Sequence, residues 1–198
     1  MKPMRILFTG VGGQGTLTAS SLLAQAALME GKEAVMSEVH GMAQRGGVVE
    51  STVMFGGLKS PIISEGEADI LVSFEPLEAI RALVKCNRES TVITNTRPTV
   101  PFTVDVGGPP YPDTDKCLEE MKCIFKKVIA MDAEAIARDA GTSKAVNVVL
   151  LGVLLGTGLV DIAPESMEET IRMRVKSGFV QANLDAFKRG LELGRKAQ

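Results

Sequence analysis

The sequence is poor in the side chains that bind metals and clusters. Among its 198 residues there is no tryptophan, and there are one tyrosine, one histidine and three cysteines. Cys86, Cys117 and Cys123 form no Cys-x-x-Cys pair, and His40 is the single histidine. We therefore expect neither an iron–sulfur cluster nor a structural zinc site on this chain alone, and we predict no metal ligands. An odd number of unpatterned thiols favours a reducing, cytoplasmic setting.

Long apolar runs and blocks of like charge are also missing. The formal net charge is −2, with lysines and arginines scattered along the chain, so we expect no nucleic-acid partner and no membrane-surface patch. The longest apolar stretch, 145–155, is interrupted by Asn147 and Gly152, and it is shorter than the roughly 20 residues of a membrane span. The N-terminal apolar run turns at once into glycines, unlike a signal peptide. These features predict a soluble protein.

What the sequence does contain is an alternation of short apolar segments with helical patterns. Apolar residues make up 45% and charged residues 23%, which is typical of a globular protein, and the length suits one domain over residues 1–198. The strands expected are 4–9, 33–38, one within 46–57, 68–72, 91–94 and 128–131. The helices expected are 16–30, 76–83, 114–125, 133–140, 144–155, 164–175 and 179–195. This order predicts an α/β fold with an open, mostly parallel, Rossmann-like sheet, helices on both faces and a helical C-terminus.

Some segments carry expectations about topology and burial. The first strand, the first helix and the second strand form a β–α–β unit, for which a right-handed, parallel crossover is expected. Alternation within 46–57 predicts a strand whose direction the sequence leaves open. Residues 95–113 hold five prolines and a Gly-Gly pair, which predicts a long irregular excursion of the kind that is usually functional or mobile. Residues 144–155 are apolar nearly all round and should be buried against the sheet or a partner subunit.

A glycine-rich loop joins the first strand to the first helix. The run Gly10-Val11-Gly12-Gly13-Gln14-Gly15 fits the pattern G-x-G-x-x-G and stands directly before Thr16. Such glycines allow a tight turn and a close approach of a ligand, and the free N–H groups of a helix N-terminus favour a phosphate or carboxylate. The alternative is a tight turn with no ligand. The candidate cofactor-binding residues here are Gly10, Gly12, Gly13, Gln14, Gly15 and Thr16.

A second polar segment, Glu38-Val39-His40-Gly41-Met42-Ala43-Gln44-Arg45-Gly46-Gly47, is expected as a loop at the carboxyl end of the second strand. Open α/β sheets bind ligands at this end. Arg45 has the planar group that clamps a carboxylate or phosphate, His40 can exchange a proton near neutral pH, and Glu38 can pair with either. His40, Arg45 and Glu38 are therefore candidate catalytic residues, none of them certain. Arg45 is also a candidate cofactor-binding residue.

The residues alone leave several functions open. Glu38 stands about 20 residues after the glycines, near where NAD-binding folds place an acidic residue for the ribose. An NAD(P)-binding Rossmann oxidoreductase is therefore one alternative, and a nucleotide-binding scaffold is another. Walker, Gly-x-Ser-x-Gly and histidine-rich metal patterns are missing from the sequence. Glu75 is interpreted as a carboxylate at the start of a helix, with a place in the ligand crevice as the alternative. The chain therefore either binds and positions a ligand without a catalytic set of its own, or it is part of a larger complex.

Three segments, taken in order, carry a resemblance to a known family. GVGGQG after the first strand, EVHGMAQRGG after the second and ADILVSFEPLEA further on closely resemble the gamma-type subunit of 2-oxoacid:ferredoxin oxidoreductases. The resemblance covers nearly the whole chain, and certainly residues 4–147. The pyruvate and 2-oxoglutarate types tend to have Tyr-Gly and then Arg-Gly-Gly at the second segment. The form VHGMAQRGG is similar to the indolepyruvate type, whose small subunit is called beta.

The resemblance implies the activity of an assembled enzyme. That enzyme would oxidatively decarboxylate indolepyruvate or another aryl pyruvate to the acyl-CoA and reduce ferredoxin, using thiamine diphosphate, [4Fe–4S] clusters and coenzyme A. The resemblance assigns the thiamine and the clusters to a large partner subunit, so this chain should bind no cofactor firmly and should be inactive alone. Residues 10–15 and Arg45 would contribute to a coenzyme A phosphate site or to the subunit contact. Whether the isolated chain forms a homodimer stays an open question.

Overall fold

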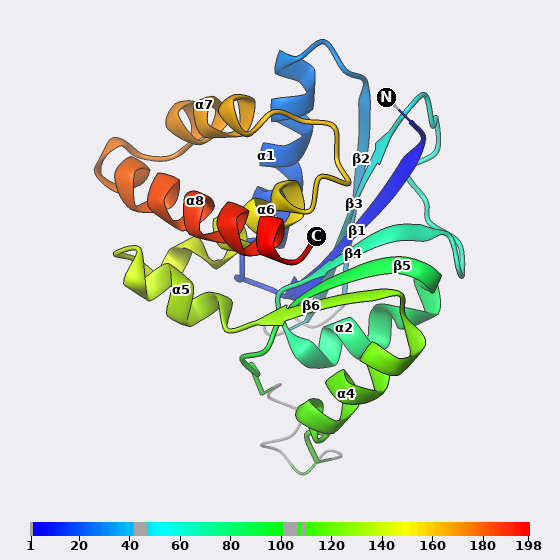
Figure 1. Ribbon diagram of the computed structural model, residues 1–198. Helices are drawn as coiled ribbons and strands as arrows, with labels where there is room; N and C mark the ends of the chain where they lie inside the picture. Colours follow the sequence, from blue (N-terminus) through cyan, green and yellow to red (C-terminus); the bar gives the residue numbers. More distant parts are fainter. Residues whose placement is uncertain (1, 42–46, 101–106, 108–109) are drawn as a thin grey trace.

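A six-stranded sheet lies between two layers of helices in the computed structural model, which describes residues 2–41, 47–100, 107 and 110–198 (Figure 1). The strands are β1 Met4–Val11, β2 Ala34–His40, β3 Val48–Phe55, β4 Ala68–Ser73, β5 Cys86–Asn95 and β6 Lys127–Met131. The helices are α1 Thr16–Met29, α2 Pro76–Ala82, α4 Thr114–Ile124, α5 Ala133–Asp139, α6 Val146–Gly156, α7 Pro164–Arg174 and α8 Val180–Lys196. Short 3-10 turns occur at η1 Leu83–Lys85, η2 Ser143–Ala145 and η3 Ser177–Phe179. The predicted α/β fold is confirmed.

The sheet order is β2-β3-β1-β4-β5-β6. β1, β4, β5 and β6 pair in parallel, whereas β3 pairs antiparallel with both β1 and β2. Every strand except β3 therefore runs in one direction, as a mostly parallel sheet requires. β1 and β2 run parallel, as expected for the β–α–β unit, but β3 lies between them and they are not neighbours in the sheet. A short connection closes β2 onto β3 at little entropic cost, with Gly41 N donating to Val48 O at 2.8 Å.

The two faces of the sheet have separate cores. Side chains alternate along a strand, so Ile6 and Phe8 of β1 point to one face and Leu7 points to the other. The first face is covered by α1, α5, α6, α7 and α8, and the second by α2 and α4, as Figure 1 shows. Helices on both faces and a helical C-terminal part agree with the sequence expectations. None of the helices in the described ranges has the length and apolarity to cross a membrane.

α6 is buried nearly all round, as expected, because α8 covers the side that the sheet leaves open (Figure 1). Four glycines allow the two helices to approach closely, namely Gly152 and Gly156 of α6 and Gly190 and Gly194 of α8, which we call the glycine seam. A Cβ atom on Gly152 would lie 2.8 Å from Leu191 N and nearer still to Phe187 O. Contact of this kind brings backbone against backbone, which only glycine permits.

Candidate functional site

The glycine loop turns the chain sharply from β1 into α1. Gly13 and Gly15 have φ angles of +97° and +88°, a region that side chains other than glycine rarely adopt. Gln14 closes the turn from within, because its Oε1 accepts from Val11 N at 2.7 Å and its own N donates to Val11 O at 3.1 Å. α1 then begins without a side-chain cap, so N–H groups of its first turn stay available to a ligand.

The structure brings the two sequence motifs together. Gly12 N donates to Gly47 O at 2.9 Å, which ties the end of the second motif to the glycine loop. Residues 42–46, Arg45 among them, lie outside the described part of the chain, so the predicted role of Arg45 stays a prediction. The end of the second motif is nevertheless adjacent to the glycine loop in space.

Glu38 and His40 lie in β2 itself and not in a loop, which corrects the expected end of this strand. His40 Nε2 is 3.4 Å from Glu38 Oε2, and their side chains are 58% and 26% exposed. The buried Glu38 Oε1 and the buried Oγ of Ser51, which stands opposite Glu38 in the sheet, have no hydrogen-bond partner among the described residues. Neither Glu38 nor His40 lines the cavity beside the glycine loop, so a catalytic role for either residue stays a prediction.

The position of β2 also bears on the NAD alternative. A ribose-binding carboxylate would have to end the strand next to β1, whereas β3 occupies that place. Glu38 is consequently displaced by a further strand spacing, about 4.8 Å. The acidic residue that suggested NAD from its spacing in the sequence is thus on the wrong strand for that role.

A cavity of about 560 Å³ opens beside the glycine loop. Its walls come from the loop, α1, α5, η2, α6 and the residues after β5, and they consist of Gly13, Gln14, Gly15, Thr18, Thr99, Glu134, Ser143, Lys144, Val146 and Asn147. This volume is within the range of about 300 to 1,000 Å³ typical of ligand sites. The cavity is therefore the candidate binding site of the chain.

Of the lining residues, only Gly13, Gln14 and Gly15 were predicted from the sequence as site residues, and Asn147, Lys144 and Glu134 are among those that were not. Asn147 is only 8% exposed, and its Oδ1 accepts from Val148 N at 3.0 Å. That amide lies against the glycine loop, 3.0 Å from where a Cβ on Gly15 would be. Lys144 adds a positive charge and Glu134 a negative one. An amide that interrupts an apolar helix was the signal in the sequence, since a buried polar group needs a purpose or a partner.

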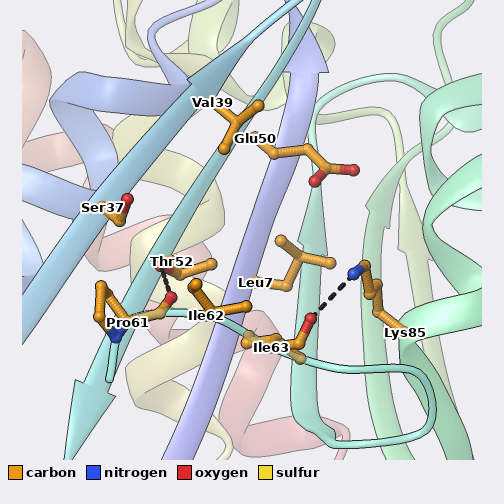
Figure 2. Close-up of a pocket in the computed structure, with 9 residues that line it drawn as sticks. All are labelled: Leu7, Ser37, Val39, Glu50, Thr52, Pro61, Ile62, Ile63 and Lys85. Atoms are coloured by element: carbon orange, nitrogen blue, oxygen red, sulfur yellow. Dashed lines mark hydrogen bonds between the residues drawn. The ribbon is translucent and has the colours of Figure 1, made fainter. Parts of the chain in front are cut away.

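A second hollow on the opposite face of the sheet is much smaller, at about 100 Å³. Figure 2 shows how the segment after β3 crosses it: Lys85 Nζ donates to Ile63 O at 2.8 Å, and Thr52 Oγ1 donates to Pro61 O at 2.6 Å. Glu50 and the apolar side chains of β1 and β2 complete the wall. This hollow is smaller than a cofactor site. The hydrogen bonds from Lys85 and Thr52 therefore serve to hold the segment after β3 in place.

Glu75 is a carboxylate at the start of α2, as the sequence predicts, and the structure shows that it is fully buried. Its Oε2 accepts from Glu78 N at 2.9 Å and caps the helix. Its Oε1 accepts from Thr99 N at 3.2 Å and from the hydroxyl of Tyr111. Burial and the hydrogen bond to Glu75 raise the pKa of Tyr111 above its usual range. Thr99 also lines the cavity, so the carboxylate that caps α2 is hydrogen-bonded to a residue of the cavity wall.

The cysteines do not form a set of metal ligands. Cys86 begins β5, and Cys117 and Cys123 lie on α4. Burial raises the pKa of the Cys86 thiol to about 11, which disfavours the thiolate that a cluster needs. Within the described ranges, no group of three His, Cys, Asp or Glu residues could hold a metal ion. These donors do not fit an iron–sulfur cluster.

The whole chain is similar to known proteins. Residues 5–193 match the family model described as pyruvate ferredoxin/flavodoxin oxidoreductase. The chain is 42% identical over 187 residues to the indolepyruvate oxidoreductase subunit IorB of Archaeoglobus fulgidus, covering 94% of this chain and 93% of that protein. It is 41% identical over 202 residues to the protein of the same name from Pyrococcus horikoshii, covering 99% and 98%.

Solved structures agree with these similarities. The gamma subunit of a keto/oxoacid ferredoxin oxidoreductase from Geobacter sulfurreducens superposes with a TM-score of 0.70 at 26% identity, over 98% of this chain and 99% of that one. A 2-oxoglutarate:ferredoxin oxidoreductase from Magnetococcus marinus shares the fold, with a TM-score of 0.75 at 19% identity, over 100% of this chain and 32% of that one. The sequence identities and the family match show that this chain belongs to the pyruvate ferredoxin/flavodoxin oxidoreductase family, as an oxidoreductase subunit of the small, IorB-like kind.

Proposed function

We propose that this chain is the small subunit of a cytoplasmic, indolepyruvate-type 2-oxoacid:ferredoxin oxidoreductase, and that its glycine-loop cavity receives the phosphate-bearing part of coenzyme A. The observation that carries the proposal is the hydrogen bond from Gly12 N to Gly47 O. This bond joins both motifs beside Gly13, at the N-terminus of α1 and at the wall of the cavity. A phosphate there would meet free N–H groups and a favourable helix dipole.

The side chains around the cavity support an anion of moderate charge. Lys144 provides a cation and the Asn147 amide a hydrogen-bond donor, while Glu134 offsets part of the positive charge. The two glycines with positive φ keep the loop free of side chains where a ligand would approach. The predicted contribution of Arg45 would add a bidentate phosphate contact.

Under this proposal the redox chemistry belongs to a larger partner subunit. That subunit would bind thiamine diphosphate and the [4Fe–4S] clusters, which carry out decarboxylation and electron transfer to ferredoxin. This chain would orient coenzyme A toward the reacting acyl group and exclude water from it. The IorB relatives favour an aryl pyruvate as the 2-oxoacid.

Calorimetric titration of the full chain tests the coenzyme A proposal. We expect coenzyme A to bind and NADH not to bind, and we expect Lys144→Gln to weaken coenzyme A binding about tenfold, as loss of a charge-assisted hydrogen bond does. Lys188→Gln, which removes an exposed lysine of α8, is the matched control and should leave the affinity unchanged. Tight NADH binding would overturn the proposal, and binding of neither ligand would leave the loop as a subunit contact.

A second experiment tests the substrate. The chain would be combined with a purified large subunit that contains thiamine and clusters, and ferredoxin reduction would be measured with indolepyruvate, phenylpyruvate and pyruvate. We expect the two aryl pyruvates to give the higher kcat/KM. Preference for pyruvate would contradict the indolepyruvate assignment while leaving the family membership intact.

A further inference from the structure

Glu75 holds three donors that come from three separate segments. Oε2 caps α2 through Glu78 N, and Oε1 accepts from Thr99 N, 24 positions away, and from the Tyr111 hydroxyl, 36 positions away. Thr99 and Tyr111 stand toward the two ends of the proline-rich excursion between β5 and α4. One buried carboxylate therefore fastens both ends of this excursion to the start of α2.

Thr99 is also fastened from the opposite side. Gln14 Nε2 is 3.2 Å from Thr99 Oγ1, and it lies 3.4 Å from Phe74 O. The Oε1 atom of the same Gln14 side chain accepts from Val11 N in the glycine loop. Tyr111, Glu75, Thr99 and Gln14 thus form a continuous chain of hydrogen bonds that ends at the glycine loop. Both Thr99 and Gln14 line the cavity.

We propose that Glu75 and Tyr111 form a clasp that positions Thr99 against Gln14 and so sets the shape and affinity of the glycine-loop cavity. The identity of the ligand rests on the function proposed above, whereas the clasp itself does not. Glu75 is a positioning residue in this account, because it acts through Thr99 and lies outside the cavity wall.

A helix cap alone does not explain this arrangement. Asp113 and Asp132 cap α4 and α5, and each accepts an N–H of its own helix through Oδ1, at 3.1 Å from Lys116 N and at 2.8 Å from Ala135 N. The cap at Glu75 uses Oε2 only, so Oε1 is free to serve the excursion. Burying a carboxylate costs free energy unless hydrogen bonds compensate for it. If Oε1 of Glu75 loses one of its two donors, we therefore expect Thr99 to be held less firmly as well.

Hydrogen–deuterium exchange of the full chain tests the clasp without any ligand. In Tyr111→Phe the ring stays and only the hydroxyl is lost, and we expect amide exchange of the peptide over residues 11–18 to become about fivefold faster, as loss of about one hydrogen bond of support allows. Asp113→Ala disturbs the α4 cap nearby without touching Glu75, and it should leave this peptide unchanged. Equal exchange in wild type and Tyr111→Phe would overturn the proposal.

Two further variants guard against an effect of misfolding. Thr99→Val removes the Oγ1 contact with Gln14 but keeps the backbone N–H, and it should also speed exchange in the glycine loop. Glu75→Gln should move the pKa of Tyr111 back toward its usual value, because the neutral amide no longer holds the phenolic proton. Phenolate absorbance reports this shift directly, since the chain has one tyrosine and no tryptophan. An unchanged Tyr111 titration in Glu75→Gln would contradict the clasp.

Coenzyme A titration then separates the clasp from the proposed function. We expect Tyr111→Phe and Thr99→Val to weaken coenzyme A binding about fivefold, in line with the loss of one modest hydrogen bond, and Asp113→Ala to have no effect. If the wild type binds no coenzyme A, the function proposed for the cavity fails while the exchange data still decide the clasp. If Tyr111→Phe and Thr99→Val bind coenzyme A as tightly as the wild type does, the coupling is wrong.

Discussion

Four glycines lie at the end of β1 and in the turn that leads into α1, which together form the glycine loop, and four others lie where α6 packs on α8. In the loop, Gly13 and Gly15 have positive φ angles, and a Cβ on Gly13 would meet nothing within 4 Å. In the seam no glycine has a positive φ, but a Cβ on Gly156 or Gly194 would lie 2.8 Å from the Cα of the other. Gly13 and Gly15 thus need glycine for their backbone conformation, with open space beside Gly13, and the seam needs glycine because two backbones touch. Substitutions should separate the two requirements: those at the glycines beside the cavity should affect ligand binding, and those in the seam should affect stability.

The largest effect is expected in the seam. In Gly190→Ala the new Cβ would lie 3.0 Å from Val149 C and nearer still to Val149 O, so α6 and α8 would have to move apart. We expect the free energy of unfolding to fall by about 3 kcal/mol or more, the upper range for overpacking a core. Urea unfolding followed by circular dichroism measures it. Gly178→Ala, where nothing lies within 4 Å, should change it by less than about 0.5 kcal/mol.

Gly10→Ala should have the next largest effect, because Gly10 is the crowded member of the loop. Its Cβ would lie 2.9 Å from Phe74 Cβ and 2.9 Å from Thr16 Oγ1. We expect a loss of about 2 kcal/mol of unfolding free energy, less than in the seam because the neighbours are side chains that can shift. Gly12→Ala is the matched control, since the nearest atom, Gly47 O, would be at 3.7 Å. Equal losses for the two variants would contradict the steric account.

Gly13→Ala should separate stability from binding. Its positive φ predicts a loss of about 1 to 2 kcal/mol of unfolding free energy, and a methyl group at the cavity wall should weaken coenzyme A binding as well. Gly31, after α1, has a φ of +70° and equally open surroundings. Gly31→Ala should therefore lose a similar amount of stability with no change in affinity. Unfolding and calorimetric titration of both variants check this, and a loss of affinity in both would show that strain alone is responsible.

The smallest effect is expected from alkaline pH. The folded state holds the pKa of Tyr111 above the value of about 10 found in unfolded chains. Above that pH the unfolded state releases the proton first, so the folded state binds more protons and the free energy of unfolding falls as pH rises. The contribution is complete below pH of about 10 and disappears as pH passes the folded pKa. The difference in stability between wild type and Tyr111→Phe should shrink over this range; a constant difference would argue against it.

The sequence predicted the glycine loop because all its parts are local. A strand, four glycines within six positions and a helix follow one another directly, and the turn they predict is the one the structure contains. The cap at Glu75 was also predictable, since Pro76 begins a helix next to it. Thr99 and Tyr111 were not, because hydrogen bonds across 24 and 36 positions leave no periodic signal.

The seam was overlooked, although its signal was present. Gly152 interrupts the apolar stretch in the sequence, and the predicted helix 144–155 stops just before Gly156. Two glycines four positions apart recur in both α6 and α8, which is the pattern of closely packed helices. Which helix pairs with which depends on the fold, and a single spacing does not specify the partner.

The place of β3 decided the interpretation of Glu38. Its spacing from the glycines fitted a ribose ligand, but the antiparallel insertion of β3 moved β2 to the sheet edge. Strand order results from the competition between a short local connection and a longer crossover, and neighbouring residues do not encode it.

The sequence by itself determined the succession of elements, the sharp turn at Gly10–Gly15, the burial of α6 and the family, because each depends on local pattern or on an ordered set of motifs. Only the tertiary structure decided that Gly47 meets Gly12, that Asn147 and Lys144 face the loop, and that Glu75 holds the excursion to it. Those contacts join residues far apart in the chain, and they form only when the strands and helices have taken their places in the sheet and its layers.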